Sequence, residues 1–232
     1  RSQYRRDTAL RIQGESLILL QEYWLNHRMQ SLPVYPEDPP AIMPDNSPDQ
    51  DLVLSFALNT PNHTPVALEA LLLGIAHAQT SLYLTTPYYI PNEQLEKALI
   101  NAATRGVCIK LLIPYKSDSS FTQRASLSFV SRLLKHDNIE IYRYQRGFIH
   151  SKTIVIDKSL SYIGTMNLDN RSFFLNFELV AVAADQSLAQ DLSQEFADTL
   201  EDAELYRLRD RRSRPRYQRS LDTLCRLLSS LL

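Results

Sequence analysis

From residue 52 onward, short apolar runs alternate with stretches in which hydrophobic residues recur at helical spacing. Thr64-Pro65 and Asn92 give two of the helical stretches ordinary start signals. The expected strands are 52–58, 81–86, 107–113, 139–144 and 177–184, with two more between 148 and 170. The expected helices are 64–78, 92–105, one from the loop at 114–120 to near 136, and 187–200. This alternation predicts an α/β fold, with a mixed, largely parallel β-sheet covered by helices on both faces.

The first fifty residues follow a different pattern. A short strand is expected at 8–12 and a helix at 17–25. Residues 33–48 hold six of the twelve prolines, which fix φ and remove backbone donors, so an extended connector is expected over 31–50. Because the chain starts at Arg1 in mid-element and without an initiator methionine, we expect a piece of a longer protein.

The last segment, 206–232, joins a basic stretch to an amphipathic helix. Residues 206–219 contain seven arginines and one acid, Asp210. The leucines that follow share one helical face: Leu221, Leu224, Leu227, Leu228 and Leu231. A basic amphipathic C-terminal helix suits an anionic membrane surface. A helix docked on its own domain, with solvated arginines, fits the same pattern, so the sequence leaves both interpretations open.

Composition narrows the class of protein without defining it. The chain is 44% hydrophobic and 22% charged, which is sufficient for a folded core. The formal net charge of −1 argues against a nucleic-acid partner, because such proteins usually carry a basic excess. Cys108 and Cys225 lie far apart, so no disulfide framework or metal knuckle is indicated. No run reaches the ~20 apolar residues of a membrane span, and no signal peptide is visible.

The segment 148–170 carries the candidate chemistry. In a strand, His150 and Lys152 project from the same face about 6–7 Å apart, and such a cationic pair needs an anion such as a phosphate. Asp157 has the opposite parity, so we expect it to bind backbone amides of the turn rather than the ligand. Gly164 permits close backbone approach, and Asn167 offers an amide donor to the same site.

The spacing His150-x-Lys152-x4-Asp157-x6-Gly164-Thr165-x-Asn167 resembles the HKD signature of the phospholipase D superfamily, with threonine where many members have serine. Its flanks, including "TTPYYIPNEQLEKALI", "GFIHSKTIVID" and "GTMNLDNRSFFLNFE", resemble the C-terminal half of bacterial cardiolipin synthases of this type. The stretch "RRDTALRIQG" resembles the segment after the first HKD motif in two-motif members. The resemblance implies that 1–30 ends a first phospholipase D-like domain, that 51–205 is a second one, and that 206–232 is a tail.

The resemblance also implies roles for individual residues. His150 corresponds to a catalytic histidine, either a nucleophile that forms a phosphohistidine or a general acid and base opposite its counterpart. Lys152 and Asn167 correspond to phosphate-binding groups, and Thr165 to a supporting hydroxyl. Glu178, in "NFE", corresponds to the carboxylate that hydrogen-bonds a catalytic histidine and sets its tautomer.

The implied reaction is phosphatidyl transfer between two phosphatidylglycerols, giving cardiolipin and glycerol at the bacterial cytoplasmic membrane. The partners are then anionic phospholipid, the membrane surface, and a first HKD domain or a second chain that completes the site. Such chemistry requires no cofactor or metal, and no cluster with metal-ligand spacing is present in the sequence. The alternatives are a phosphodiesterase or nuclease completed by chain pairing, and a non-catalytic lipid-binding half.

Polar residues at strand ends are candidates for substrate contacts, since ligand loops of α/β sheets lie there. Tyr88 and Tyr89 follow one expected strand, and buried packing is the alternative for both. Lys116, Asp118 and Arg171 lie in loops, with plain solvation as their alternative.

Overall fold

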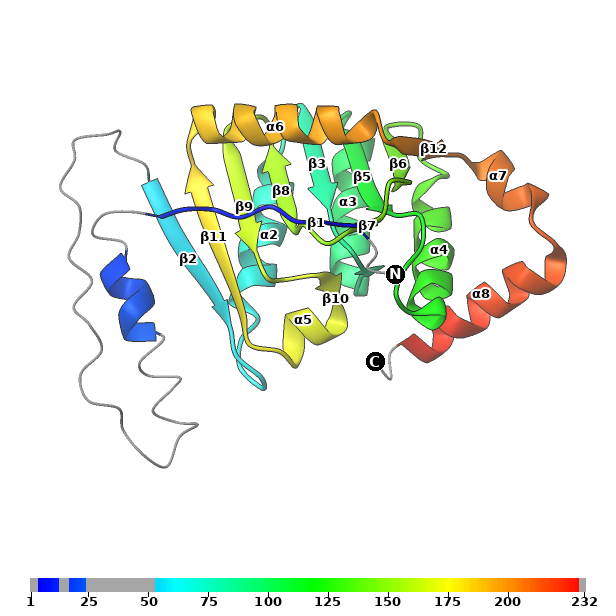
Figure 1. Ribbon diagram of the computed structural model, residues 1–232, viewed down its shortest axis with the longest axis horizontal. Helices are drawn as coiled ribbons and strands as arrows, with labels where there is room; N and C mark the ends of the chain where they lie inside the picture. Colours follow the sequence, from blue (N-terminus) through cyan, green and yellow to red (C-terminus); the bar gives the residue numbers. More distant parts are fainter. Residues whose placement is uncertain (1–3, 13–16, 24–52, 230–232) are drawn as a thin grey trace.

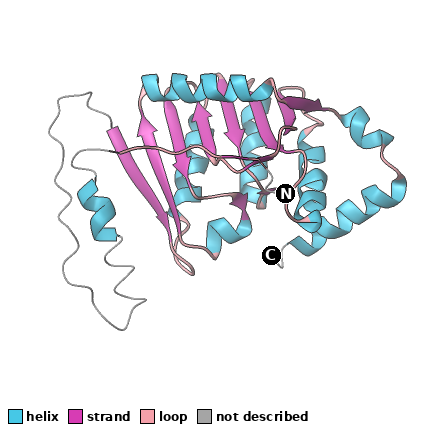
Figure 2. Ribbon diagram, viewed as in Figure 1, coloured by secondary structure: helices cyan, strands magenta, loops and turns pink. Residues whose placement is uncertain are grey.

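The computed structural model describes residues 4–12, 17–23 and 53–229. Residues 53–229 form one eight-stranded sheet with helices packed on it (Figures 1 and 2). Its strands, in sheet order, are β12 (Ala203–Tyr206), β6 (Ile139–Tyr144), β5 (Cys108–Pro114), β3 (Ser81–Thr85), β8 (Thr153–Ile156), β9 (Leu160–Gly164), β11 (Glu178–Ala184) and β2 (Val53–Asn59). Short strands outside this sheet are β1 (Arg5–Arg6), β4 (Tyr89–Ile90), β7 (Phe148–Ile149) and β10 (Leu168–Asp169).

The α/β class and the mixed sheet are confirmed, but the expectation of a largely parallel sheet is wrong. Within the large sheet, the pairs β3–β5 and β5–β6 are parallel, and every other neighbouring pair is antiparallel. The parallel strands are joined through helices, as parallel connections require. β8 and β9 are joined by a tight hairpin, and no long crossover helix lies between β9 and β11, so these strands run antiparallel.

Helices cover both faces, as the sequence predicts. They are α2 (Val66–His77), α3 (Glu93–Thr104), α4 (Ser120–Leu133), α5 (Asn170–Phe174), α6 (Gln186–Leu200), α7 (Leu208–Ser213) and α8 (Arg216–Leu228). Alternate residues of β3 point to opposite cores: Leu82 and Leu84 pack with α2 and α3, while Tyr83 packs with α6 and stacks on Phe196. Each fully buried leucine contributes about 1.5–3 kcal/mol by leaving water, so both layers stabilise the sheet.

Asp157 holds the β8–β9 hairpin against the start of β3. Asp157 and Lys158 both have positive φ, which lets the chain turn tightly. The carboxylate of Asp157 accepts hydrogen bonds from the backbone N–H groups of Gln79, Thr80 and Ser81, at 2.8, 2.7 and 2.9 Å. Burial acts to raise the pKa of Asp157, but these hydrogen bonds outweigh it and hold the pKa below its ordinary value. The residue therefore binds backbone amides, as its strand parity predicts.

Replacing Asp157 should destabilise the fold. We expect Asp157→Ala to lower the free energy of unfolding by about 2–3 kcal/mol, since it leaves amides without acceptors and places alanine at positive φ. Asp157→Asn is the matched control, which tolerates the turn and keeps one oxygen acceptor. Because the folded pKa is depressed, this stabilisation is complete above the ordinary pKa of aspartate and disappears as pH falls through the folded value. Urea unfolding at neutral and acidic pH measures both effects; equal stabilities at neutral pH would contradict them.

Residues 4–12 form an extended segment, called the strap below, that runs across the strands of the large sheet (Figure 1). β1 pairs in parallel with β7, and Leu10 packs beside α6. The Thr8 hydroxyl donates to the Glu195 carboxylate at 2.9 Å and lies 3.0 Å from the Ser151 hydroxyl. The expected strand at 8–12 is wrong, because this part of the strap is held by side chains rather than by a backbone ladder. Residues 17–23 are helical, as expected; the rest of that helix and the proline-rich connector lie outside the described residues.

No helix in the described parts of the chain is both long enough and apolar enough to cross a membrane. The basic C-terminal segment forms α7 and α8, and α8 lies against α4 (Figure 1). The domain boundaries predicted from the sequence stay predictions, although β12 extends the sheet to Tyr206 and the strap joins the same body.

Candidate active site

His150 and Lys152 meet in the link between β7 and β8 rather than within a strand. β7 pairs with β1, whereas β8 pairs with β3 and β9, so the chain leaves one ladder and joins another at these residues. The two side chains still converge. Lys152 Nζ lies 3.2 Å from His150 Nδ1 and 3.1 Å from Nε2, and it donates to the His150 carbonyl at 2.6 Å. His150 and Lys152 therefore form the expected pair, but they do so from a loop rather than from alternate positions of one strand.

The carboxylate beside His150 is Asp7, from the strap. Asp7 Oδ2 lies 2.9 Å from His150 Nδ1, across 143 residues of sequence. A carboxylate at Nδ1 favours the tautomer with its proton on that nitrogen and leaves Nε2 with a lone pair. Sequence reasoning missed Asp7. The signal for it was present in "RRDTALRIQG", whose resemblance to the segment after a first HKD motif placed it near an active site.

Glu178 is expected to hydrogen-bond a catalytic histidine, but it does not contact His150. It is buried at the start of β11, where it accepts hydrogen bonds from Thr165 Oγ1 and from Asn176 Nδ2, the latter at 3.2 Å. Thr165 Oγ1 also accepts the N–H of Leu179 at 3.0 Å. Gly164 makes this approach possible, because a Cβ there would lie 2.1 Å from the Leu179 carbonyl oxygen. Thr165 and Gly164 thus bring Glu178 to the end of β9.

The electrostatic surroundings of Lys152 set its charge. Burial lowers the pKa of Lys152 to about 8, while Asp7 and Glu178 act to raise it and Arg5 acts to lower it. The ammonium is thus charged at neutral pH and close to losing its proton. An anionic ligand beside it would favour the charged form.

A cavity of about 250 Å³ contains Asn167 of the same motif in its wall, and its wall residue Asp169 acts to raise the pKa of Lys152, although neither His150 nor Lys152 lines it. Its walls are formed by Tyr88, Ile90, Thr122, Asn167, Asp169, Asn170, Arg171, Asn176 and Ser229. The side-chain oxygens of Asn167 and Asn170 are buried with no hydrogen-bond partner, although buried polar atoms are nearly always paired. These unpaired oxygens are acceptors, so they mark the cavity as a place for a ligand group that donates hydrogen bonds, such as a hydroxyl.

The α5 turn that carries this wall is held by one buried side chain. Asn59 Nδ2 donates to the carbonyls of Ser172 and Phe173, and its Oδ1 accepts the N–H of Ala67. Asp169 caps α5 by accepting from the Ser172 N–H at 2.8 Å, and burial raises the pKa of Asp169. The cavity wall is thus fixed from β2 and β10.

The remaining candidates divide by exposure. Tyr88 lines the cavity and donates to Asp118 Oδ2 at 2.6 Å, so both lie at its edge. Burial acts to raise the pKa of Asp118, but hydrogen bonds from Tyr88 and other donors hold it below its ordinary value. Arg171, expected in a loop, lies in α5 and lines the cavity, and its contact with a substrate stays a prediction. Tyr89 as a substrate contact is wrong, because β4 turns it into the core at 0% exposure. Lys116 is exposed and not part of the cavity wall.

Among the described residues, no three His, Cys, Asp or Glu side chains lie close enough together to hold a metal ion.

Solved structures define the class of fold. The chain matches the phospholipase D family member Nuc from Salmonella typhimurium with a TM-score of 0.58 and 20% identity, over 68% of this chain and 99% of that one. It matches phosphatidylserine synthase from Haemophilus influenzae Rd KW20 with a TM-score of 0.63 and 13% identity, over 78% and 46%. Identities this low establish the fold alone, which is that of a phospholipase D-like domain.

Sequence comparison defines the family. Residues 71–200 match the family described as "Cardiolipin synthase, PLD-like domain". Over 98% of its length the chain is 33% identical to cardiolipin synthase A of Pseudomonas putida (strain GB-1), of which the match covers 47%. The chain belongs to the cardiolipin synthase family of phospholipase D-like domains, which confirms the resemblance inferred from its motif. It spans about half the length of the curated relatives it matches.

Proposed function

We propose that this domain supplies one of two half-sites of a phosphatidyltransferase that makes cardiolipin from two phosphatidylglycerols. The proposal is carried by the meeting of Asp7, His150 and Lys152, and supported by a cavity whose wall includes Asn167 of the same motif. An oriented imidazole provides the nucleophile, and the ammonium and amide groups stabilise negative charge on a phosphodiester in its transition state. Family membership supports a phospholipid as the substrate.

The transfer proceeds in two balanced steps. Nε2 of His150 attacks the phosphorus of one phosphatidylglycerol, the bond from phosphorus to the terminal glycerol oxygen breaks, and glycerol leaves with a proton from the second half's histidine. That histidine then takes a proton from the glycerol hydroxyl of a second phosphatidylglycerol. The hydroxyl oxygen displaces His150 from phosphorus and forms cardiolipin. The same balance holds if the two histidines exchange roles.

The second half-site comes from a neighbouring HKD domain of the complete protein or from a second chain. Glu178 supports this, because it is a buried carboxylate near the cavity residue Asn176 and does not contact His150. In the completed site it orients the histidine of the other half, as Asp7 orients His150. The substrate places this site at the surface of the bacterial cytoplasmic membrane.

Pairing of half-sites is tested by assaying cardiolipin formation from phosphatidylglycerol vesicles. We expect turnover from the complete protein that contains this chain, and also from this chain when a second half-site is supplied. Monomeric chain should give none. Full transfer by a monomer, verified by light scattering, would contradict the half-site proposal, and hydrolysis of a diester without transfer would favour the phosphodiesterase alternative.

Asp7→Asn should reduce the rate of transfer by about 100- to 10,000-fold, because an amide at Nδ1 no longer fixes the tautomer or stabilises the imidazolium. Folding should be unaffected, since the Asp7 side chain is more than half exposed. Asp137→Asn, at an exposed position away from the site, is the matched control. Steady-state rates on phosphatidylglycerol vesicles measure the effect, and an unchanged rate would show that Asp7 does not orient His150.

A further inference from the structure

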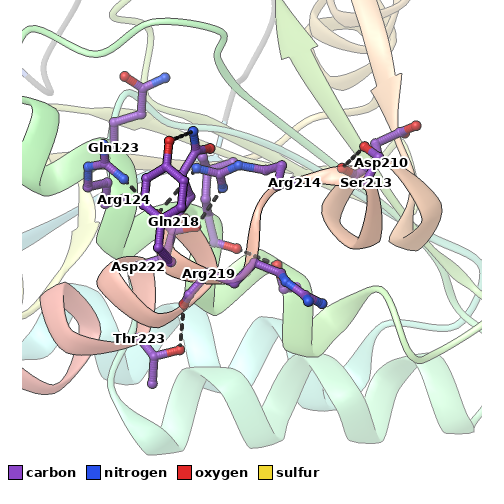
Figure 3. Close-up of polar contacts among 12 residues, drawn as sticks. Gln123, Arg124, Asp210, Ser213, Arg214, Gln218, Arg219, Asp222 and Thr223 are labelled. Carbon is purple, nitrogen blue, oxygen red and sulfur yellow. Dashed lines mark hydrogen bonds and ion pairs between the residues drawn. The ribbon is translucent and has the colours of Figure 1, made fainter.

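Helix α8 docks on the domain through its polar side. Asp222 is 2% exposed and forms ion pairs with Arg124 of α4, at 3.4 Å, and with Arg214, at 2.5 Å. Figure 3 shows these three side chains meeting between the helices. One turn further on, Cys225 is buried beside Ile90. The face of α8 that touches the protein is therefore centred on a buried ion pair.

The apolar side of α8 points away from the protein. Tyr217, Leu221, Leu224 and Leu228 follow one another at helical spacing and are 70%, 40%, 51% and 44% exposed. A surface helix of a globular protein ordinarily turns such a stripe toward its core. Here the stripe lies opposite Asp222, so it remains on the outer surface. Its orientation is fixed by the ion pairs of Asp222 rather than by leucine packing.

The charge around this stripe is strongly positive. Residues 206–229 contain eight arginines and two acids, Asp210 and Asp222, in a chain whose formal net charge is −1. Both acids are already engaged, Asp222 with Arg124 and Arg214 and Asp210 with Arg209 at 3.8 Å. The exposed arginines, among them Arg212 of α7 and Arg216 in the first turn of α8, thus give a net positive charge to the segment that carries the leucines.

The C-terminal end of α8 reaches the candidate active site. Ser229, which follows α8 directly, is buried and lines the same cavity as Asn167 and Arg171. The cavity that we assign to the phosphodiester therefore lies at the C-terminal end of α8, on the docked side of the helix. The apolar stripe runs along the other side of the same helix and ends near this cavity.

We propose that the outer face of α8 inserts among the lipids of an anionic bilayer and holds the cavity at the lipid surface. The leucines enter the acyl boundary while the arginines bind lipid phosphates, which is the behaviour of an interfacial helix. Its polar side stays on the domain, so α8 is both docked and amphipathic, and the two interpretations of the tail combine. The inference rests on the proposed phospholipid substrate and names the surface that receives it.

Flotation of the full 232-residue chain with vesicles tests this proposal. The vesicles contain phosphatidylcholine alone or phosphatidylcholine with phosphatidylglycerol, at low and high salt. The double variant Leu221→Gln/Leu224→Gln should bind the anionic vesicles at least about tenfold more weakly, since each leucine loses apolar burial. Arg212→Gln/Arg216→Gln should lose about fivefold per arginine at low salt, and this loss should vanish at high salt. Leu73→Gln, at a leucine of α2 that is 63% exposed, is the matched control and should bind normally.

Binding is scored without turnover, so His150→Ala should bind vesicles like the unaltered chain. Failure of the catalytic proposal would then leave this inference intact. The leucine and arginine variants replace exposed side chains and should keep the unaltered melting temperature. Unchanged vesicle affinity of the leucine variant would overturn the inference. The inference would also be overturned if the leucine variant changed its oligomeric mass while it kept its vesicle affinity. The stripe would then be a protein interface.

Discussion

His150→Ala should lower the rate of cardiolipin formation by the complete protein by at least about 1,000-fold, because it removes the group that attacks phosphorus or relays the proton. The histidine side chain is about a quarter exposed, its polar contacts are with Asp7 and Lys152, and its ring lies 6.0 Å from that of Phe148 at the edge of the core. The melting temperature should therefore change little. Steady-state rates on phosphatidylglycerol vesicles, together with thermal unfolding, measure the two quantities separately.

His63→Ala is the control, since His63 is exposed in the turn between β2 and α2. It should retain full activity. A His150→Ala protein that keeps more than about a tenth of the activity would remove His150 from the chemistry. Wholesale unfolding of that variant would instead make it a structural histidine.

Lys152→Met should lower kcat/KM by about 100- to 1,000-fold, the size of effect seen when one donor to a developing oxyanion is removed. The charge on Lys152 also predicts a pH dependence. Because its pKa is about 8, the free enzyme holds the ammonium below that pH and loses it above. We therefore expect kcat/KM to fall as pH rises through about 8, which is the pKa of Lys152 in the free enzyme.

Lys152→Arg separates charge from geometry. A guanidinium keeps its charge at all accessible pH values, so residual activity of this variant should lack the decline on the alkaline side. Lys135→Met, at an exposed lysine following α4, should leave both rate and pH profile unchanged. A profile of the unaltered protein that stays flat to about pH 10 would show that Lys152 does not hold the substrate as an ammonium.

Periodic features of the fold could be predicted from the sequence, whereas long-range pairing could not. The alternation of Leu82, Tyr83 and Leu84 defines a strand buried on both faces, and the structure places these residues in opposite cores. Strand direction depends on connections that periodicity does not encode, so the antiparallel half of the sheet was missed. Tyr88 and Tyr89 differ only by parity, and the two-residue strand β4 decides which of them faces the cavity.

The candidate site shows the same division. His150, Lys152 and Asn167 are recognisable because their spacing is local, and the structure brings the first two into contact even outside a strand. Asp7 reaches His150 across 143 residues through β1–β7 pairing, which no local pattern predicts. The leucine stripe of α8 is visible in the sequence, but its outward orientation depends on Asp222 being buried against Arg124 and Arg214.

Product analysis in water enriched in oxygen-18 tests the central claim most directly. The complete protein is incubated with phosphatidylglycerol vesicles, and the lipid products are examined by mass spectrometry. Phosphatidyl transfer predicts one glycerol for each cardiolipin and no heavy oxygen in the cardiolipin phosphates, since the acceptor oxygen comes from lipid. Phosphatidic acid carrying oxygen-18 as the main product, with no cardiolipin, would contradict it and identify the site as a hydrolase.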